Sequence, residues 1–362
     1  MKTIKNLYPK IYDFENLYKA WENARKGKRF RDEVLTFTSN LEENLIDIQN
    51  HLIYGTYQVG KYRPFYVYEP KKRLVMALPF RDRVVQWAIY RQLFPMIDKY
   101  FIFDSYACRE GKGAHAAANR LQYWLRKTDR KQERYYYLKL DISKYFYRVD
   151  HEVLMNILRK KIRDKPLLDL LCTLINCEET KFGLPAGVDP DACPENERLS
   201  DVGMPIGNLT SQMFANLYLN ELDKFAKHKL RLHYYIRYMD DIIILHPDKN
   251  YLTEIKNEIE SFLNNELHLQ LNNKTAIRPC SMGIEFVGFR IWATHRKLKT
   301  KTAKKIKSRI KYLIKEKESG KITKESFDRS IASYKGILKH CNSYGMRQSL
   351  NEIFKKNRGE GH

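Results

Sequence analysis

Two adjacent carboxylates, Asp240 and Asp241, stand at the centre of residues 232–245. Runs rich in β-branched and aromatic residues flank them on both sides, a pattern that predicts a β-hairpin. The turn Tyr238-Met239-Asp240-Asp241 has no glycine and no lysine beside the pair, although two-residue hairpin turns favour Asn-Gly or Asp-Gly. A pair of divalent cations would relieve the repulsion between the carboxylates. Two such ions can clamp the attacking and leaving oxygens of phosphoryl transfer.

A third carboxylate closes another apolar segment. Residues 135–141 read Tyr-Tyr-Tyr-Leu-Lys-Leu-Asp, so Asp141 ends a predicted strand and precedes an aromatic turn. Taken singly, Asp141 could equally be a helix N-cap, and an Asp-Asp pair is most often a solvated turn. The apolar run after Asp241 indicates that the hairpin is buried in a sheet, which argues against a solvated turn. Together the three aspartates predict a cage for Mg²⁺, which takes one or two carboxylates, water and substrate phosphates.

These carboxylates need a sheet that brings them together. Between residues 135 and 277 the predicted order is strand, helix, strand, turn, strand, helix and strand. That order matches a βαββαβ ferredoxin-like sheet, in which Asp141 would lie beside Asp240. The expected fold class is therefore α+β. Strands are also expected at 62–70, 74–79, 269–277 and 283–291, and helices at 30–50 and 251–267.

Basic residues near two turns are candidates for phosphate contact. The segment from 71 to 83 carries Lys71, Lys72, Arg73, Arg81 and Arg83. Guanidinium groups grip phosphate oxygens in a bidentate manner, although a solvated basic hairpin explains the pattern equally well. Arg109, next to the glycines at 111 and 113, is a further candidate. The glycine-rich stretch 203–207 would let a ligand approach the backbone closely.

The charge of the whole chain favours a polyanionic partner. The 362 residues carry a formal net charge of +23, with 13% aromatic residues that could stack on bases. Residues 296–317 combine eleven Lys or Arg with an apolar stripe, which predicts a packed helix whose basic face contacts a nucleic-acid backbone. A basic membrane-surface protein is the competing class, but no apolar anchor supports it. The six cysteines form no CxxC pair, so reduced thiols in a cytoplasm are expected.

The motifs occur in an order that resembles a reverse transcriptase. They are the basic hairpin, the Asp141 strand, the Gly-rich helix start, the Tyr-Met-Asp-Asp hairpin, Leu-x-Leu-Asn-x-Lys-Thr and Phe-Val-Gly-Phe. The resemblance covers about residues 62–290. It implies a right-hand polymerase fold with fingers, a ferredoxin-like βαββαβ palm and an α-helical thumb. The implied domains are an N-terminal helical extension (1–60), fingers (61–134), palm (135–290, with an insertion at about 152–200) and a basic helical thumb (291–362).

The same resemblance implies roles for individual residues. Asp141 and Asp240, with the backbone at Ile142, would hold two Mg²⁺ ions, for which Mn²⁺ could substitute, and Asp241 would assist. Phe146 occupies the steric-gate position that excludes a ribose 2′-hydroxyl, and Lys274 would lie near the leaving pyrophosphate. The implied nucleotide contacts are Arg73, Lys72, Arg109, Phe146, Ile206, Gly207 and Gln212. The implied primer and template contacts are Tyr238, Met239, Phe286, Gly288, Phe289, Lys304, Lys305 and Arg309.

A subfamily is indicated by the stretch Pro205-Ile-Gly-Asn-Leu-Thr-Ser-Gln. Most bacterial relatives carry Gln-Gly here and end the motif in Ser-Pro, whereas this chain has Ile206 and Gln212. This version resembles the reverse transcriptases of diversity-generating retroelements. That resemblance implies error-prone copying of a template-repeat RNA at adenines, cDNA that diversifies a target gene by mutagenic retrohoming, and a basic pentameric accessory protein. Template RNA, the RNA–DNA hybrid and dNTPs would be the other partners, in a bacterial or phage-encoded cytoplasmic protein without a membrane role.

Other assignments stay open. A retron, a defence-associated or a group II intron-like reverse transcriptase would share the catalytic motifs, and the residues after Gly288 leave room for a thumb but no appended endonuclease. A nucleic-acid-binding scaffold that has lost catalysis is less consistent with three retained carboxylates. The Pro-, Asp- and Glu-rich segment 178–200 is expected to be a loop or insertion, with no role assigned.

Overall fold

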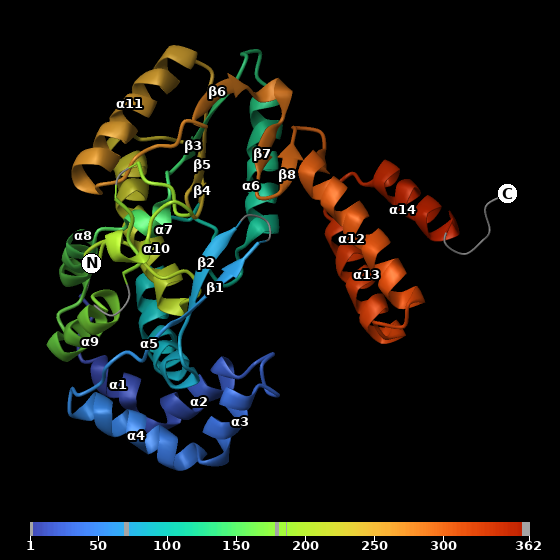
Figure 1. Cartoon of the computed structure of the whole chain (residues 1–362). Coiled ribbons are helices and arrows are strands. Elements are labelled where there is room, and N and C mark those ends of the chain that lie inside the picture. The colour runs from blue at the N-terminus through green and yellow to red at the C-terminus, as the bar shows by residue number, and fades with distance from the viewer. Residues whose placement is uncertain (1–2, 69–71, 178–180, 186, 357–362) are drawn as a thin grey trace. The chain divides into compact units, whose positions relative to one another are not determined.

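The structure is a computed structural model that describes residues 3–68, 72–177, 181–185 and 187–356 (Figure 1). The chain divides into two compact units, each built from three segments. The first comprises Met1–Cys108, Asp141–Leu232 and Ile255–Lys274, and the second comprises Arg109–Leu140, His233–Glu254 and Thr275–His362. Within the described residues, no helix is long and apolar enough to cross a membrane.

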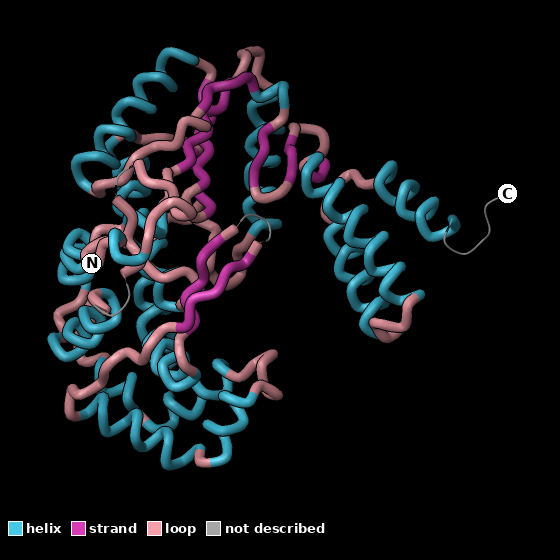
Figure 2. Tube along the Cα trace, in the orientation of Figure 1, coloured by secondary structure: helices cyan, strands magenta, loops and turns pink. Residues whose placement is uncertain are grey.

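The first unit is mainly helical (Figure 2). Its helices are α1 (Tyr8–Tyr12), α2 (Phe14–Ala24), α3 (Asp32–Ser39), α4 (Leu41–Ile53), α5 (Phe80–Asp98), α7 (Tyr145–Arg148), α8 (His151–Lys161), α9 (Lys165–Ile175), α10 (Leu209–Lys224) and the π-helix η2 (Phe225–Lys229), with a 3₁₀ turn η1 at Glu195–Glu197. Helix α11 (Lys249–Glu266) ends in this unit. The helix expected at 30–50 is in fact two helices, because Asn40 leaves the helical conformation (φ −120°, ψ 50°).

An antiparallel hairpin, β1 (Arg63–Val67) with β2 (Arg73–Ala77), belongs to the same unit. It confirms the two strands expected on either side of the basic turn. All five residues of β1 are exposed, and β1 pairs with β2 in a two-stranded sheet. Lys71, which was expected in the turn, lies outside the described residues.

A four-stranded sheet forms the centre of the second unit. Its strands are β3 (Tyr136–Asp141), β4 (Tyr235–Tyr238), β5 (Asp241–His246) and β6 (Ala276–Pro279), in the order β4-β5-β3-β6. The pairs β4–β5 and β3–β6 are antiparallel. This is the strand order of a βαββαβ ferredoxin-like sheet, so the α+β fold class expected from the sequence is confirmed.

The central strands are held by burial. Ile242 to Leu245 on β5 and Leu138 and Leu140 on β3 are almost completely buried. Each fully buried aliphatic side chain contributes about 1.5–3 kcal/mol relative to an exposed one. The strand expected at 269–277 is shorter than predicted. Only its end joins the sheet as β6, while Leu271 forms an isolated bridge with Ile142.

A second, smaller sheet follows in the same unit. Strands β7 (Ile284–Phe286), β8 (Phe289–Ile291) and β9 (Arg296–Leu298) pair in sequence order, after a 3₁₀ turn η3 at Cys280–Met282. The prediction of a single strand at 283–291 is therefore wrong, because this range contains two strands. The chain reverses at Val287 and Gly288, whose φ angles of 43° and 87° both lie in the left-handed region that a two-residue hairpin turn requires.

Four further helices complete the second unit. They are α6 (Ala114–Asp129), α12 (Thr300–Glu318), α13 (Lys324–Leu338) and α14 (Tyr344–Lys356), of which the last three pack around one apolar cluster. The stripe expected on the basic helix, Ile306, Ile310, Leu313 and Ile314, faces that cluster. A packed helix with a basic outer face is thus confirmed for α12.

Candidate active site

The Asp-Asp turn is a two-residue hairpin loop. Tyr238 pairs with Asp241 across β4 and β5, so Met239 and Asp240 form the turn, and Met239 has a φ of 53°. A residue other than glycine in the left-handed region costs free energy. Arg237, fully buried on β4, donates a hydrogen bond from Nη1 to the Met239 carbonyl oxygen at 3.1 Å. That bond stabilises the turn directly at its strained residue.

The Asp241 carboxylate is paired with a lysine. Lys139 Nζ lies 2.9 Å from Asp241 Oδ1 and 3.1 Å from Oδ2. Lys139 stands on β3, which the sheet order places next to β5. No lysine is adjacent to the carboxylates in the chain, as the sequence showed, but the fold brings Lys139 to Asp241 from another strand. The sequence could not show this pairing, because Lys139 and Asp241 are 102 positions apart and only the strand order brings them together.

Asp141 is the last residue of β3 and is half-buried. Its carbonyl oxygen accepts a hydrogen bond from Asn272 N at 2.7 Å, and the neighbouring Ile142 is buried and bridges to Leu271. In the part of the chain that the structure describes, no group of three or more His, Cys, Asp or Glu side chains is arranged to hold a metal ion. Carboxylate and carbonyl oxygens are nevertheless the donors that Mg²⁺ prefers, so the residue types fit that ion while the three-carboxylate cage remains a prediction.

Phe146 and Ile206 come together in the first unit. Both side chains pack against one apolar cluster, made up of Tyr62, Met76, Leu78, Tyr147, Phe182, Leu184 and Cys193. The Phe146 carbonyl accepts from Met204 N at 2.7 Å, and the Ile206 carbonyl accepts from Met76 N at 3.0 Å. The structure therefore brings the two expected nucleotide-site residues onto a common support beside β2.

Gly207 occupies a position that only glycine suits. Its φ is 121°, and a Cβ atom there would lie 2.9 Å from Val75 Cγ1 and 3.2 Å from the Met76 carbonyl oxygen. The close approach to β2 explains the glycine by packing alone. Farther along, Gln212 on α10 accepts a weak hydrogen bond from the Cys108 thiol at 3.4 Å. Arg109, which follows Cys108, is half-buried.

The basic residues of 71–83 have different surroundings. Arg73 is exposed on β2, whereas Lys72 pairs with Asp191 at 2.9 Å. Asp191 belongs to the segment 178–200, whose contact with the hairpin the sequence did not suggest. Arg83 pairs with Glu33 on α3. An engaged guanidinium group is less available to phosphate, so Arg73 is the better candidate of this group.

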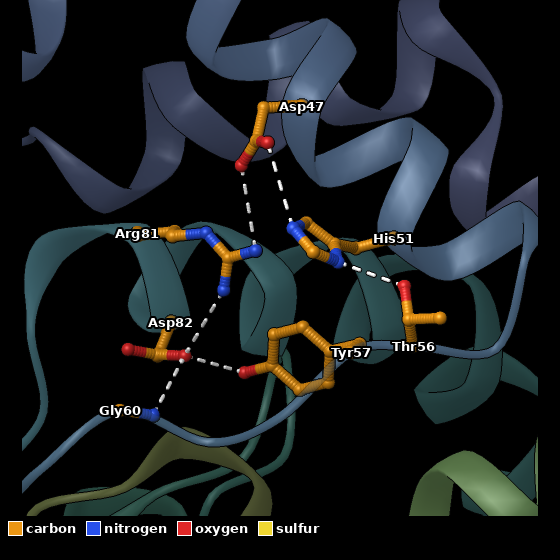
Figure 3. A network of polar contacts seen from close by, with 7 residues as sticks. All are labelled: Asp47, His51, Thr56, Tyr57, Gly60, Arg81 and Asp82. Atoms are coloured by element: carbon orange, nitrogen blue, oxygen red, sulfur yellow. Dashed lines mark hydrogen bonds and ion pairs between the residues drawn. The ribbon is translucent and has the colours of Figure 1, made fainter.

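Arg81 belongs to a polar network between α4 and α5 (Figure 3). Its Nη2 lies 3.5 Å from Asp47 Oδ2, and its Nη1 lies 4.0 Å from Asp82 Oδ1. The buried Asp82 carboxylate also accepts from the Tyr57 hydroxyl at 2.6 Å and from Gly60 N at 3.3 Å. Burial and the nearby Asp82 charge raise the pKa of Tyr57 well above its usual value. Arg81 thus supports the packing of α5 on the N-terminal helices.

The remaining expected contacts lie in several places. Lys274 is exposed in a turn after Asn272, whose side chain accepts from the Lys274 backbone N–H at 3.2 Å. Phe286 and Phe289 are buried on either side of the β7–β8 turn that contains Gly288. On α12, Lys304, Lys305 and Arg309 are exposed and lie outside the apolar stripe. The aromatic pair thus anchors the β7–β8 hairpin, while the α12 cations are accessible.

A sheet with this strand order, an Asp-Asp turn between β4 and β5 and an aspartate at the end of β3 defines the palm of a polynucleotide polymerase. The family model described as "Reverse transcriptase (RNA-dependent DNA polymerase)" matches residues 68–291, more than half of the chain. The chain belongs to the reverse transcriptase family and is an RNA-directed DNA polymerase by class.

Proteins similar to this chain include two bacterial ones. Protein YkfC of Escherichia coli is 25% identical over 279 residues, covering 67% of this chain and 70% of YkfC. The group II intron-encoded protein LtrA of Lactococcus lactis is 26% identical over 406 residues, covering 91% of this chain and 63% of LtrA. Among solved structures, telomerase from Candida albicans shows 15% identity and a TM-score of 0.45, covering 67% of this chain and 46% of the telomerase chain.

Proposed function

We propose that this protein copies an RNA template into cDNA by nucleotidyl transfer dependent on two Mg²⁺ ions. The observation that carries the proposal is the Tyr-Met-Asp-Asp hairpin, whose strand β5 is hydrogen-bonded to the strand that ends at Asp141. Asp141 and Asp240 would hold the ions, with the Ile142 backbone and Asp241 assisting. Bound Mg²⁺ would activate the primer 3′-hydroxyl and neutralise charge at the leaving pyrophosphate.

Other residues would position the substrates. Phe146 would close the space beside the sugar of the incoming nucleotide, and Arg73 would contact its triphosphate together with Lys72 or Arg109. Lys274 would lie near the pyrophosphate, and the β7–β8 hairpin would hold the primer end. The exposed cations of α12 would contact the backbone of the hybrid, because Lys and Arg neutralise phosphates without reading sequence.

Primer extension on an RNA template with dNTPs and Mg²⁺ tests this proposal. DNA product is expected from the wild-type protein, and Asp240→Asn/Asp241→Asn is expected to lose product by a factor of about 10³ or more, because both carboxylates of the turn lose their charge. The control is Lys131→Met, which replaces an exposed lysine before β3 and should leave DNA synthesis unchanged. Full activity in the double variant would overturn the proposal and favour a nucleic-acid-binding scaffold.

A finer proposal concerns what the enzyme copies. Ile206 and Gln212 support a diversity-generating retroelement enzyme, which would copy a template-repeat RNA with errors at adenines. A basic pentameric accessory protein in a bacterial or phage-infected cytoplasm would assist it. The second candidate is a group II intron-like enzyme, supported by the similarity to LtrA over 91% of this chain.

Error frequency separates these two candidates. An aliphatic residue at 206 offers no side-chain hydrogen bond that could reward correct geometry of the incoming nucleotide. Sequencing of the cDNA is therefore expected to show substitutions concentrated opposite template adenines, and Ile206→Gln is expected to reduce them severalfold. Accurate cDNA from the wild-type protein would favour the intron-like or retron assignment, and an unchanged error spectrum in Ile206→Gln would remove residue 206 from the explanation.

A further inference from the structure

We propose that Lys139 is a positioning residue that holds the Asp241 carboxylate and connects it to the hairpin expected to grip the primer. This inference rests on the proposed function for its catalytic consequence. Three oxygens surround Lys139 Nζ, namely both oxygens of Asp241 at 2.9 and 3.1 Å and the Glu285 carbonyl oxygen at 2.7 Å. Lys139 donates hydrogen bonds to Asp241 Oδ2 and to the Glu285 carbonyl oxygen, and its contact with Asp241 Oδ1 is an ion pair.

Partial burial reduces the screening of this ion pair by water and salt. The side chains of Lys139 and Asp241 are only 24% and 27% exposed. Exposed pairs contribute little because water and salt screen them, whereas removing one partner from a shielded pair leaves a poorly solvated charge. With Asp240 adjacent in the chain, the ammonium also lowers the repulsion within the Asp-Asp turn.

The third contact extends the connection beyond the central sheet. Glu285 is the middle residue of β7, next to Phe286 in the hairpin. The Glu285 side chain pairs with Lys299 at 2.9 Å, and Lys299 is the residue before α12. The backbone N–H of Lys299 donates to the Gly288 carbonyl oxygen at 3.1 Å. Asp241, Lys139, Glu285 and Lys299 therefore form a continuous chain of polar contacts within the second unit.

This arrangement assigns Lys139 two effects. In the protein without metal, the ammonium occupies the place of a cation at Asp241, so it competes with a divalent ion for that carboxylate. During synthesis, the ammonium keeps the carboxylate in register with the β7 backbone, where the primer end is expected. Loss of Lys139 should therefore strengthen cation binding while it weakens catalysis, a combination that simple unfolding would not produce.

The first test measures Mn²⁺ binding to the nucleic-acid-free protein by electron paramagnetic resonance of free Mn²⁺. Lys139→Met is expected to tighten binding by a factor on the order of ten, because it removes a positive charge close to the carboxylate. Lys139→Arg is expected to restore the wild-type affinity. The matched control is Lys131→Met, which removes the same charge in the same unit from a lysine that contacts the Tyr135 hydroxyl at 2.9 Å, and it should leave the affinity unchanged.

The second test is a double-mutant cycle in primer extension. Lys139→Met is expected to lower kcat about tenfold with little change in KM for dNTP, since it misplaces a carboxylate without touching nucleotide. In the Asp241→Asn background the same substitution should have almost no further effect, because its target charge is gone. Equal losses in both backgrounds, or an unchanged Mn²⁺ affinity in Lys139→Met, would overturn the proposal. If the wild-type protein made no DNA, the proposed function would fail, while Mn²⁺ binding would still decide the role of Lys139.

Discussion

At the scale of single residues, charge compensation explains how a turn without glycine can carry two adjacent carboxylates. Arg237 bonds to the backbone of the turn and Lys139 bonds to the Asp241 side chain. Both cations come from strands of the same sheet, so folding of the sheet and assembly of the turn are coupled. The gating role proposed for Phe146 belongs to the same scale, because it would depend on one side chain.

Phe146→Ala is expected to admit ribonucleotides. The ring is half-buried and packs against the apolar cluster that Ile206 also contacts, so its removal opens space without removing a hydrogen bond. We expect discrimination between dNTP and rNTP to fall by at least about tenfold, since steric exclusion of a hydroxyl is lost. Single-nucleotide insertion kinetics with dCTP and CTP measure this ratio. A conservative Phe146→Tyr change should keep the selection, and unchanged discrimination in Phe146→Ala would rule out a gating role.

At the scale of elements, helix α8 begins at a capped and charged residue, Asp150. Asp150 accepts a hydrogen bond from Val153 N at 3.0 Å with one oxygen and from His268 Nδ1 at 2.8 Å with the other. Burial alone would raise the pKa of Asp150, but these hydrogen bonds and the His268 charge outweigh it and lower the pKa below its usual value. The cap therefore contributes stability that depends on pH.

Asp150→Ala is expected to reduce the free energy of unfolding by about 1–2 kcal/mol at pH 7, because the N-cap acceptor is lost. Asp150→Asn keeps an acceptor and should lose less. Because the folded pKa is lowered, the carboxylate stabilises the fold above its unfolded pKa of about 3.9, and this contribution disappears as pH falls through the folded pKa. Urea unfolding at pH 7 and near pH 3 checks this. A difference between wild type and Asp150→Asn that grew on acidification would contradict the assignment.

At the scale of the whole molecule, a net charge of +23 predicts binding to nucleic acid that weakens steeply with salt. The apolar face of α12 is buried against α13 and α14, and Lys304, Lys305 and Arg309 are exposed outside it. Counterion release makes the affinity fall with log salt in proportion to the number of phosphates contacted. These three side chains should therefore account for a measurable part of the slope of log affinity against log salt concentration.

The triple variant Lys304→Ala/Lys305→Ala/Arg309→Ala is expected to reduce the magnitude of this slope by about two to three units, at roughly 0.7–0.9 per phosphate contact. Fluorescence anisotropy with an RNA–DNA hybrid at several KCl concentrations measures it. Lys10→Ala/Lys26→Ala/Lys249→Ala removes the same charge from exposed positions elsewhere and should change the slope much less. Equal reductions in both variants would mean that net charge, and not α12, determines binding.

Local sequence patterns were enough to predict much of the secondary structure of this protein and its candidate catalytic carboxylates. Alternating and continuous apolar runs depend on neighbours along the chain, so the sequence predicted the strand ending at Asp141, the Asp-Asp hairpin, the βαββαβ order and the stripe on α12. Those patterns also established the resemblance to reverse transcriptases. The structure divides two expected elements where backbone conformation overrode composition, at Asn40 and at the Val287-Gly288 turn.

Only the tertiary structure decided which charges meet. Lys139 reaches Asp241 because β3 and β5 are neighbours in the sheet, and Arg83 reaches Glu33 because α5 packs near α3. Similarly, Phe146 and Ile206 share a cluster because distant segments fold onto β2. Ion pairs and side-chain packing act through space over a few ångströms, whereas sequence periodicity reports only on one element at a time. The carboxylates were therefore predictable from the sequence, whereas the pairing of Lys139 with Asp241 was not.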